Sequence, residues 1–186
     1  MAYNKSQIDR IGNLLVYITS KLGAIPKTKL LKLIYIVEEE SIKKGGTQFT
    51  DLSYTYLPMG PVSTFVNTQI SKKRKELLDF IDIQEKGKTT LISSRIAFSD
   101  NEFSKFDIEL MDDVLTKFGN WKIPDLIEYT HREGSPWKKI HDEFEQAPPA
   151  NKRTLNMFVL LNQQDVNTHL KDIANEENAF MTYLKN

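Results

Sequence analysis

Residues 27–46, KTKLLKLIYIVEEESIKKGG, are the stretch around which the rest of this chain is organised. Pro26 stands directly before it, where the missing N–H of proline would have no partner in a helix anyway. Gly45 and Gly46 follow, and glycine readily adopts the left-handed conformation that ends many helices. Apolar residues cover more than half of the helix circumference: Leu30, Leu31, Leu33, Ile34, Tyr35, Val37 and Ile42. A helix of this kind has to be covered on several sides, so the stretch predicts a central buried helix over about residues 28–44.

Helical periodicity elsewhere predicts neighbours for this helix. The first of them ends only four residues before it, at the link 23–26, so the two should pack together. Ser99 followed by Glu102 has the form of a capping box, which predicts a helix start just beyond it. The expected helices cover about residues 5–22, 103–118, a segment from Pro124 onward, and 163–184. The central helix is expected to be the most buried element, packed against the first two of these.

Alternating residues predict a small amount of sheet. Residues 49–57 alternate aromatic and polar side chains and predict a short strand, which the sequence PMGP at 58–61 ends sharply. Ser63 or Thr64 is expected to cap a helix that continues towards residue 81. Residues 81–98 predict a hairpin with its turn at 85–88. The predicted fold class is therefore α+β, mainly α: a helical domain around a central buried helix with a small antiparallel sheet or hairpin.

Composition narrows the class of protein. The chain has 186 residues and no cysteine, which excludes thiol catalysis, zinc–thiolate sites and disulfides. Its 25 basic and 25 acidic residues balance, so no overall field favours nucleic acid or a membrane. No apolar run approaches the roughly 20 residues of a membrane span, so a cytoplasmic protein is expected. The segment QAPPA at 146–150 suggests a division into a domain at 1–147 and a helical extension at 148–186, packed on the same domain.

Catalytic motifs are not apparent. The three histidines, His131, His141 and His169, have no spacing that would place two metal ligands on one helix face. The acidic runs 38–40 and 112–113 are interpreted as solvated faces, and no nucleophile elbow or phosphate-binding loop occurs. A Ser–His–Asp site stays open, because its members need not be neighbours in sequence. We expect no enzyme activity, no catalytic residue, no metal site and no cofactor.

One basic cluster leaves nucleic-acid binding as an alternative function. It consists of Lys72, Lys73, Arg74 and Lys75. Such a cluster can contact phosphates, and a helix followed by a hairpin is the outline of a winged helix. Against this stand the zero net charge and the mildly basic hairpin tip, EKGK at 85–88. A solvated helix face is the simpler interpretation, and the same cluster could instead attract an acidic partner.

Two further segments have rigid turns beside aromatic residues. The first is YTYLPMGPV at 54–62, in which Gly60 and Pro61 form a turn. The second is HREGSPW at 131–137, in which Pro136 is expected to stiffen a loop that presents Trp137. Each segment alone is typical of a turn or of a Trp that fills the core.

In combination with the central helix, these segments resemble the Panacea domain, the SocA-like family. The resemblance rests on the order and spacing of three elements, at 29–37, 54–62 and 131–137, and covers about residues 8–140. It departs from the commoner pattern at 57–59, where LPM replaces an aromatic residue before Gly-Pro. The region after Ala147 is not covered.

The resemblance implies a bacterial or phage antitoxin-type domain that binds a partner protein. Members of the family are linked to toxin–antitoxin loci, and some deliver their partner to a Clp-type protease. The alternative function is a winged-helix-like transcriptional repressor. The residues expected at the partner surface are Tyr54, Tyr56, Met59, Gly60, Pro61, His131 and Trp137. Four of these, Tyr54, Tyr56, Met59 and Trp137, are expected to lie near one another with at least two partly exposed.

Overall fold

The computed structural model describes residues 3–146 and 154–162, together with residues 172, 175–176, 179–180 and 182–183. Most of the expected linker at 146–150 and most of the expected helix at 163–184 lie outside these residues. Among the residues that are described, every helix is too short or too polar to cross a lipid bilayer.

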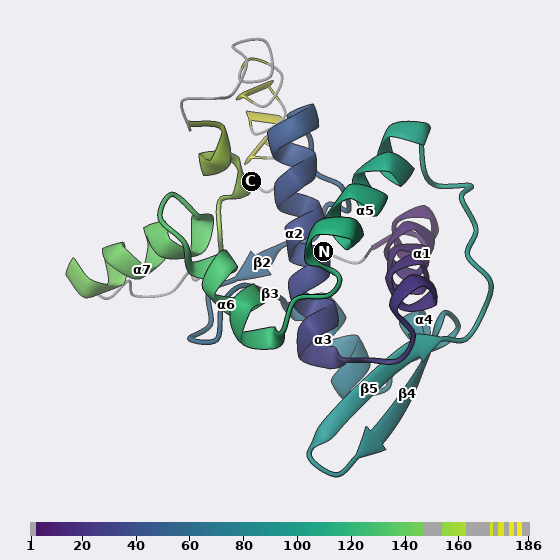
Figure 1. Cartoon of the computed structure of the whole chain (residues 1–186). Helices are drawn as coiled ribbons and strands as arrows, with labels where there is room; N and C mark the ends of the chain where they lie inside the picture. The colour runs from purple at the N-terminus through teal and green to yellow at the C-terminus, as the bar shows by residue number, and fades with distance from the viewer. Residues whose placement is uncertain are drawn as a thin grey trace.

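The predicted central helix is α2, Lys27–Gly45, and it runs through the middle of the molecule (Figure 1). It contacts α1 (Lys5–Leu22), α5 (Lys105–Phe118), α6 (Ile123–His131) and the 3-10 helix η1 (Met157–Asn162). Its apolar residues Leu30, Leu33, Ile34, Tyr35, Ile36, Val37 and Ile42 are completely buried. The expected position of α2 between neighbouring helices is confirmed, as is the mainly helical fold class with a small antiparallel sheet.

A three-stranded antiparallel sheet lies beside α1, in the order β1-β5-β4. The hairpin of β4 (Ile81–Lys86) and β5 (Thr89–Ser94) confirms the prediction for this region, with Ile83 opposite Ile92. The third strand, β1 (Ile25–Pro26), was not expected, because the link 23–26 is too short to show alternation. Proline is tolerated there because β1 is an edge strand.

The second sheet is smaller than the sequence predicts. It pairs only β2 (Tyr54–Thr55) with β3 (Val62–Ser63). The observed strand is therefore much shorter than the one predicted at 49–57. At the start of the expected strand, Oε1 of Glu38 in α2 accepts a hydrogen bond from the backbone N of Phe49 at 2.7 Å. The chain at this point is therefore bound to a helix side chain and makes no strand.

The helix after β3 is also shorter than predicted. Ser63 caps α3 (Thr64–Ser71) as expected, but the helix does not continue to residue 81. Lys73 has a φ of 47°, in the left-handed region, and this breaks the chain before the short helix α4 (Lys75–Leu78).

Two other helix starts differ from the prediction. Ser104 caps α5 and forms the capping box with Asp107, whereas the backbone N of Ser99 donates to Asn13. Pro136 does not stiffen a loop, because it is the first residue of α7 (Pro136–Gln146), a position that proline suits. The sequence does signal a helix start near α5, but both Ser99 and Ser104 fit the capping pattern. Pro136 likewise fits either a rigid loop or the first residue of a helix.

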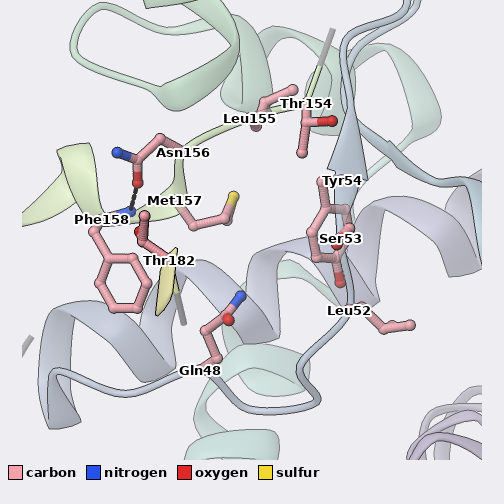
Figure 2. Close-up of a pocket in the computed structure, with 10 residues that line it drawn as sticks. All are labelled: Gln48, Leu52, Ser53, Tyr54, Thr154, Leu155, Asn156, Met157, Phe158 and Thr182. Atoms are coloured by element: carbon pink, nitrogen blue, oxygen red, sulfur yellow. Dashed lines mark hydrogen bonds between the residues drawn. The ribbon is translucent and has the colours of Figure 1, made fainter. Parts of the chain in front are cut away.

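The segment at 154–162 packs against the rest of the molecule. Thr154 forms a β-bridge with Thr55, and the backbone N of Leu155 donates to the carbonyl of Tyr54 at 2.8 Å. Figure 2 shows Thr154 and Leu155 beside Tyr54, where they border a hollow of about 210 Å³. Four apolar side chains of the segment are buried: Leu155, Met157, Leu160 and Leu161. The division into 1–147 and 148–186 remains a prediction.

Candidate functional site

The surface of α2 that faces the loops is charged, although it is buried. Glu38 and Glu39 are fully buried and Lys32 is only 1% exposed. We call these three residues the charged face of α2: Lys32 and Glu39 point the same way, and Glu38 lies about 120° further around the helix axis. The interpretation of residues 38–40 as a solvated face was therefore wrong for Glu38 and Glu39. Buried charges need compensating partners, and each of these side chains has one in a different loop.

Glu38 holds the segment that follows α2. Its Oε2 accepts a hydrogen bond from the Thr50 hydroxyl at 2.7 Å, in addition to the Oε1 bond from the N of Phe49. Burial raises the pKa of Glu38 to about 7, and the hydrogen bonds from Thr50 and Phe49 oppose that rise.

Glu39 holds the end of α6. Its Oε2 lies 2.8 Å from Nη2 of Arg132, and this ion pair neutralises a carboxylate that water does not reach. The same guanidinium donates to the carbonyl of Tyr129 at 2.8 Å and lies 4.0 Å from the centre of the Tyr129 ring. Arg132 is thereby fixed in position directly after His131.

Lys32 holds the turn at Gly60 and Pro61. Its Nζ donates to the carbonyl of Pro61 at 3.2 Å, and burial lowers its pKa to about 7. Gly60 has a φ of +96°, and a Cβ placed on it would lie 2.3 Å from Nζ of Lys32. Glycine is therefore required here for two reasons: the backbone conformation and the close approach of the lysine.

His131 faces the same turn. A Cβ on Gly60 would lie 2.9 Å from Nε2 of His131, and this nitrogen is buried with no hydrogen-bond partner among the described residues. Burial and the neighbouring charge of Lys32 lower the pKa of His131 to about 4. The imidazole is consequently neutral at pH 7, as a stacked and desolvated ring should be.

Four rings continue outward from this point. We call His131, Trp137, His141 and Tyr56 the aromatic stack. The ring centres of His131 and Trp137 are 3.6 Å apart, those of Trp137 and His141 4.7 Å, and those of Trp137 and Tyr56 5.1 Å, with interplanar angles of 11°, 16° and 21°. The hydroxyl of Tyr56 lies 3.0 Å from Nδ1 of His141. These contacts join β2, α6 and α7 into one unit.

Trp137 fixes the stack to the turn. Its Nε1 donates to the carbonyl of Leu57 at 2.8 Å, so the polar end of the indole is satisfied while its ring is buried. At the outer edge, Phe144 lies 4.9 Å from Tyr56 between ring centres. The stack therefore runs from His131, whose Nε2 is buried, to the partly exposed side chains of Tyr56 and Phe144.

The structure places the expected partner residues at different depths. Tyr56 and His131 are partly exposed, and Met59 is 63% exposed. Four others are buried: Tyr54, Gly60, Pro61 and Trp137. Tyr54 points inward, with its ring 5.1 Å from that of Tyr35, so it supports the surface from beneath. The expectation of at least two partly exposed residues among the aromatic residues and Met59 is met by Tyr56 and Met59.

Sequence reasoning missed some of the residues that build this site. Lys32 received no role, although a lysine flanked by Leu31 and Leu33 in an apolar helix is an available signal. His141 and Phe144 follow Trp137 at helical spacing. Because a loop was expected at Pro136, these residues were not placed on one helix face with Trp137. The basic cluster at 72–75 is fully on the surface, between α3 and α4, and α4 contacts α1 and β4. It is not part of the aromatic stack.

The described part of the chain contains no cluster of residues suited to bind a metal ion. Across residues 3–146, 154–162 and the few described positions beyond, no three His, Asp or Glu side chains are grouped to hold a metal ion.

Comparison with known protein families identifies the family of this chain. The sequence profile of the family described as Antitoxin SocA-like, Panacea domain matches residues 30–138. No curated protein and no solved structure matches the chain. The match includes Lys32, the Gly60–Pro61 turn and both His131 and Trp137, and it covers more than half of the sequence. The chain therefore belongs to the SocA-like, Panacea domain family of antitoxins.

Proposed function

We propose that this protein neutralises a partner toxin in the cytoplasm by direct binding, without chemical turnover. The observation that carries the proposal is the surface around Tyr56 and Met59: Met59 is exposed on the turn at 57–60, which follows the partly exposed Tyr56 of the aromatic stack. Met59 is the most exposed large apolar side chain in residues 3–146. Aromatic residues and methionine are enriched at protein interfaces. Family membership supports a toxin as the kind of partner.

The way this surface is held also favours binding. Lys32 and Trp137 fix the two sides of the turn that carries Met59, through the carbonyls of Pro61 and Leu57. A surface that is already ordered loses little conformational entropy when a partner binds. The buried contacts therefore prepare the exposed side chains for an interface.

A protease can enter this function at a second step. Neutralisation by sequestration leaves the toxin intact, whereas delivery to a Clp-type protease shortens its lifetime in cells. We propose direct binding as the step common to both. The lifetime of the toxin, measured with and without this protein and with and without the protease, separates the two routes.

The test is co-expression with the protein encoded by the neighbouring open reading frame. We expect Met59→Ala and Tyr56→Ala to abolish or weaken growth rescue, with the Met59 variant melting at the wild-type temperature. Ile96→Ala is the matched control, because Ile96 is an exposed apolar residue just beyond the hairpin and outside this surface. His131→Ala, in a protein that stays folded, should change binding modestly and abolish no reaction.

Two results would contradict the proposal. One is a purified protein that turns over a nucleotide, peptide or ester and loses that activity with a single His or Ser substitution. The other is rescue that survives both surface substitutions. If rescue and melting temperature fall together at every position, the surface lies elsewhere, for example on the expected helix at 163–184.

A DNA-binding repressor is the second candidate, favoured by one structural observation. The hairpin β4–β5 follows α3 and α4, and β1 completes a three-stranded sheet, which is the outline of a winged helix. The four basic side chains at 72–75 are exposed between these elements and form no ion pair within the described residues. They are therefore available to phosphates.

The two candidates differ in their response to salt. A repressor should retard a fragment of its own promoter, with an affinity that falls steeply as salt rises. Replacing Lys72, Lys73, Arg74 and Lys75 with Gln should remove that shift while leaving toxin rescue intact. Retardation that persists in this variant, or that is absent in the wild type, would exclude this cluster as a DNA contact.

A further inference from the structure

The exposed face of α6 carries a hollow that the proposed interface does not use. It has a volume of about 490 Å³ and is lined by Trp121, Asp125, Glu128, Tyr129 and Arg132. We call it the α6 notch. Asp125 is three residues before Glu128 and four before Tyr129, and Arg132 follows these two by four and three, so the residues line one side of α6 and its ends. The notch begins next to the aromatic stack, because Arg132 directly follows His131.

Two aromatic rings form the corner of the notch. The rings of Trp121 and Tyr129 lie at 89° with their centres 6.0 Å apart, and Phe118 packs behind both at 4.9 Å and 4.7 Å. Phe118 is buried, whereas Trp121 and Tyr129 are partly exposed. The corner is therefore held in place from below, with aromatic surface facing solvent.

The charges around this corner are unbalanced. Asp125 and Glu128 are both exposed, and neither forms an ion pair in the part of the chain that the structure describes. Asp125 accepts a hydrogen bond from the backbone N of Lys122 at 3.2 Å. The positive charge of Arg132 is already matched by Glu39 at 2.8 Å. Within the described residues, two carboxylates thus lie beside an aromatic corner without an ion-pair partner.

The molecule itself shows how a cation binds here. The guanidinium of Arg132 lies 4.0 Å from the centre of the Tyr129 ring, and Nζ of Lys43 lies 5.9 Å from it. Cations are attracted to the faces of aromatic rings, most strongly to Trp. The Trp121 side of the corner offers the same chemistry, together with two carboxylates that form no ion pair within the described residues.

We propose that the α6 notch binds an arginine or lysine side chain of the protein partner. The guanidinium or ammonium group lies against Trp121 and between the carboxylates of Asp125 and Glu128, and its aliphatic stem covers the apolar floor. An arginine anchored in an aromatic pocket is a common centre of binding energy in protein interfaces. That the partner is a toxin rests on the proposed function. That the notch binds a cation rests on its own residues.

The test uses the whole protein and a small probe, Nα-acetyl-arginine amide. The chain has two tryptophans, Trp121 and Trp137, so protein labelled with 5-fluorotryptophan has two ¹⁹F resonances, which Trp121→Phe assigns. We expect the probe to move the Trp121 resonance saturably and to leave that of the buried Trp137 in place. Nα-acetyl-citrulline amide, which has the same shape without the charge, should move neither. The lysine analogue should behave like the arginine probe.

Charge variants provide the second arm. The double variant Asp125→Asn, Glu128→Gln should lower the affinity for the arginine probe by about five- to tenfold, since exposed charge contacts are individually modest. Glu76→Gln with Asp79→Asn removes the same two charges at α4 and should leave the affinity unchanged. Equal shifts with citrulline, an unmoved Trp121 resonance, or wild-type affinity in the double variant would each overturn the proposal.

Toxin rescue separates this proposal from the function it deepens. If the wild type rescues cells but the probe does not bind as expected, the notch is not a cation site and the proposed function stands. If the probe binds but no toxin is neutralised, the cation site stands and the proposed function fails. When both hold, Glu128→Lys should reduce rescue without lowering the melting temperature.

Discussion

The two faces of α2 are buried to the same extent but differ in chemistry. One face packs aliphatic residues such as Leu33 and Val37 against the core, and both of these side chains are completely buried. The other face buries Lys32, Glu38 and Glu39, and each of these side chains contacts a separate loop. Apolar burial is non-directional, whereas a buried charge needs a partner at a defined position.

This difference indicates a division of roles within one helix. The apolar face stabilises the fold as a whole. The charged face sets where three loops lie: the segment at 49–50, the Gly60–Pro61 turn and the end of α6 at Arg132. The proposed partner surface is built on two of these loops. Its geometry therefore depends on side chains that never reach the surface.

The largest expected effect tests the apolar face. Leu33→Ala and Ile34→Ala should each lower the free energy of unfolding by about 2–5 kcal/mol, as truncations in a packed core do. Urea unfolding followed by circular dichroism measures this loss. A loss below ~1 kcal/mol at both positions would mean that α2 is not the centre of the core.

The next effect tests the turn that the charged face holds. Gly60→Ala should lower the free energy of unfolding by about 2–4 kcal/mol, because a methyl group meets Lys32 and His131 and the positive φ strains the backbone. Gly87→Ala is the matched control, since Gly87 has a φ of +61° in open space. Its loss should be only about 1–2 kcal/mol. Equal losses would show that contact with Lys32 and His131 is unimportant.

Sequence reasoning predicted the apolar face well. Periodic aliphatic residues, Pro26 and Gly46 placed α2 within about one residue of its observed ends. The hairpin was also predictable, because alternation and the turn at Gly87 agree with each other. Errors arose where a side chain distant in sequence determines the backbone conformation. At Phe49, for example, the backbone N–H bonds to Glu38 and not to a neighbouring strand.

The charged face could not be predicted in the same way. Three consecutive glutamates at 38–40 have the composition of a solvated surface, and only the tertiary structure supplies Thr50 and Arg132 as partners. The segments 54–62 and 131–137 contact each other in the structure, but the sequence does not distinguish their exposed members from their buried ones. Exposure depends on how α7 stacks against β2, which no local pattern specifies.

A pH profile sharpens the comparison further. The pKa of Lys32 is about 7 in the folded protein and its ordinary value is 10.5, so between these values the unfolded chain binds a proton that the folded chain does not. Stability must then rise with pH across this window and fall as pH drops towards 7. We expect the wild type to gain about 1–2.5 kcal/mol relative to Lys32→Met between pH 7 and pH 9. Parallel profiles would contradict a buried, neutral Lys32.

The smallest effect on stability is expected at the surface. Met59→Ala should change the free energy of unfolding by less than about 0.5 kcal/mol, because the side chain is 63% exposed. Thermal unfolding against the wild type measures this. A loss above ~1.5 kcal/mol would place Met59 among the supporting residues and remove it from the proposed interface.

Hydrogen exchange of two adjacent variants tests the central claim most directly. Lys32 and Leu33 are neighbours in sequence, but Lys32 contacts the Gly60–Pro61 turn whereas Leu33 packs in the apolar core. We predict that Lys32→Met speeds amide exchange only around residues 57–63 and 129–137, whereas Leu33→Ala speeds it throughout the slowly exchanging core, because only the second lowers global stability substantially. Faster exchange throughout the core in Lys32→Met, or no change at the turn, would contradict the separation of roles between the two faces of α2.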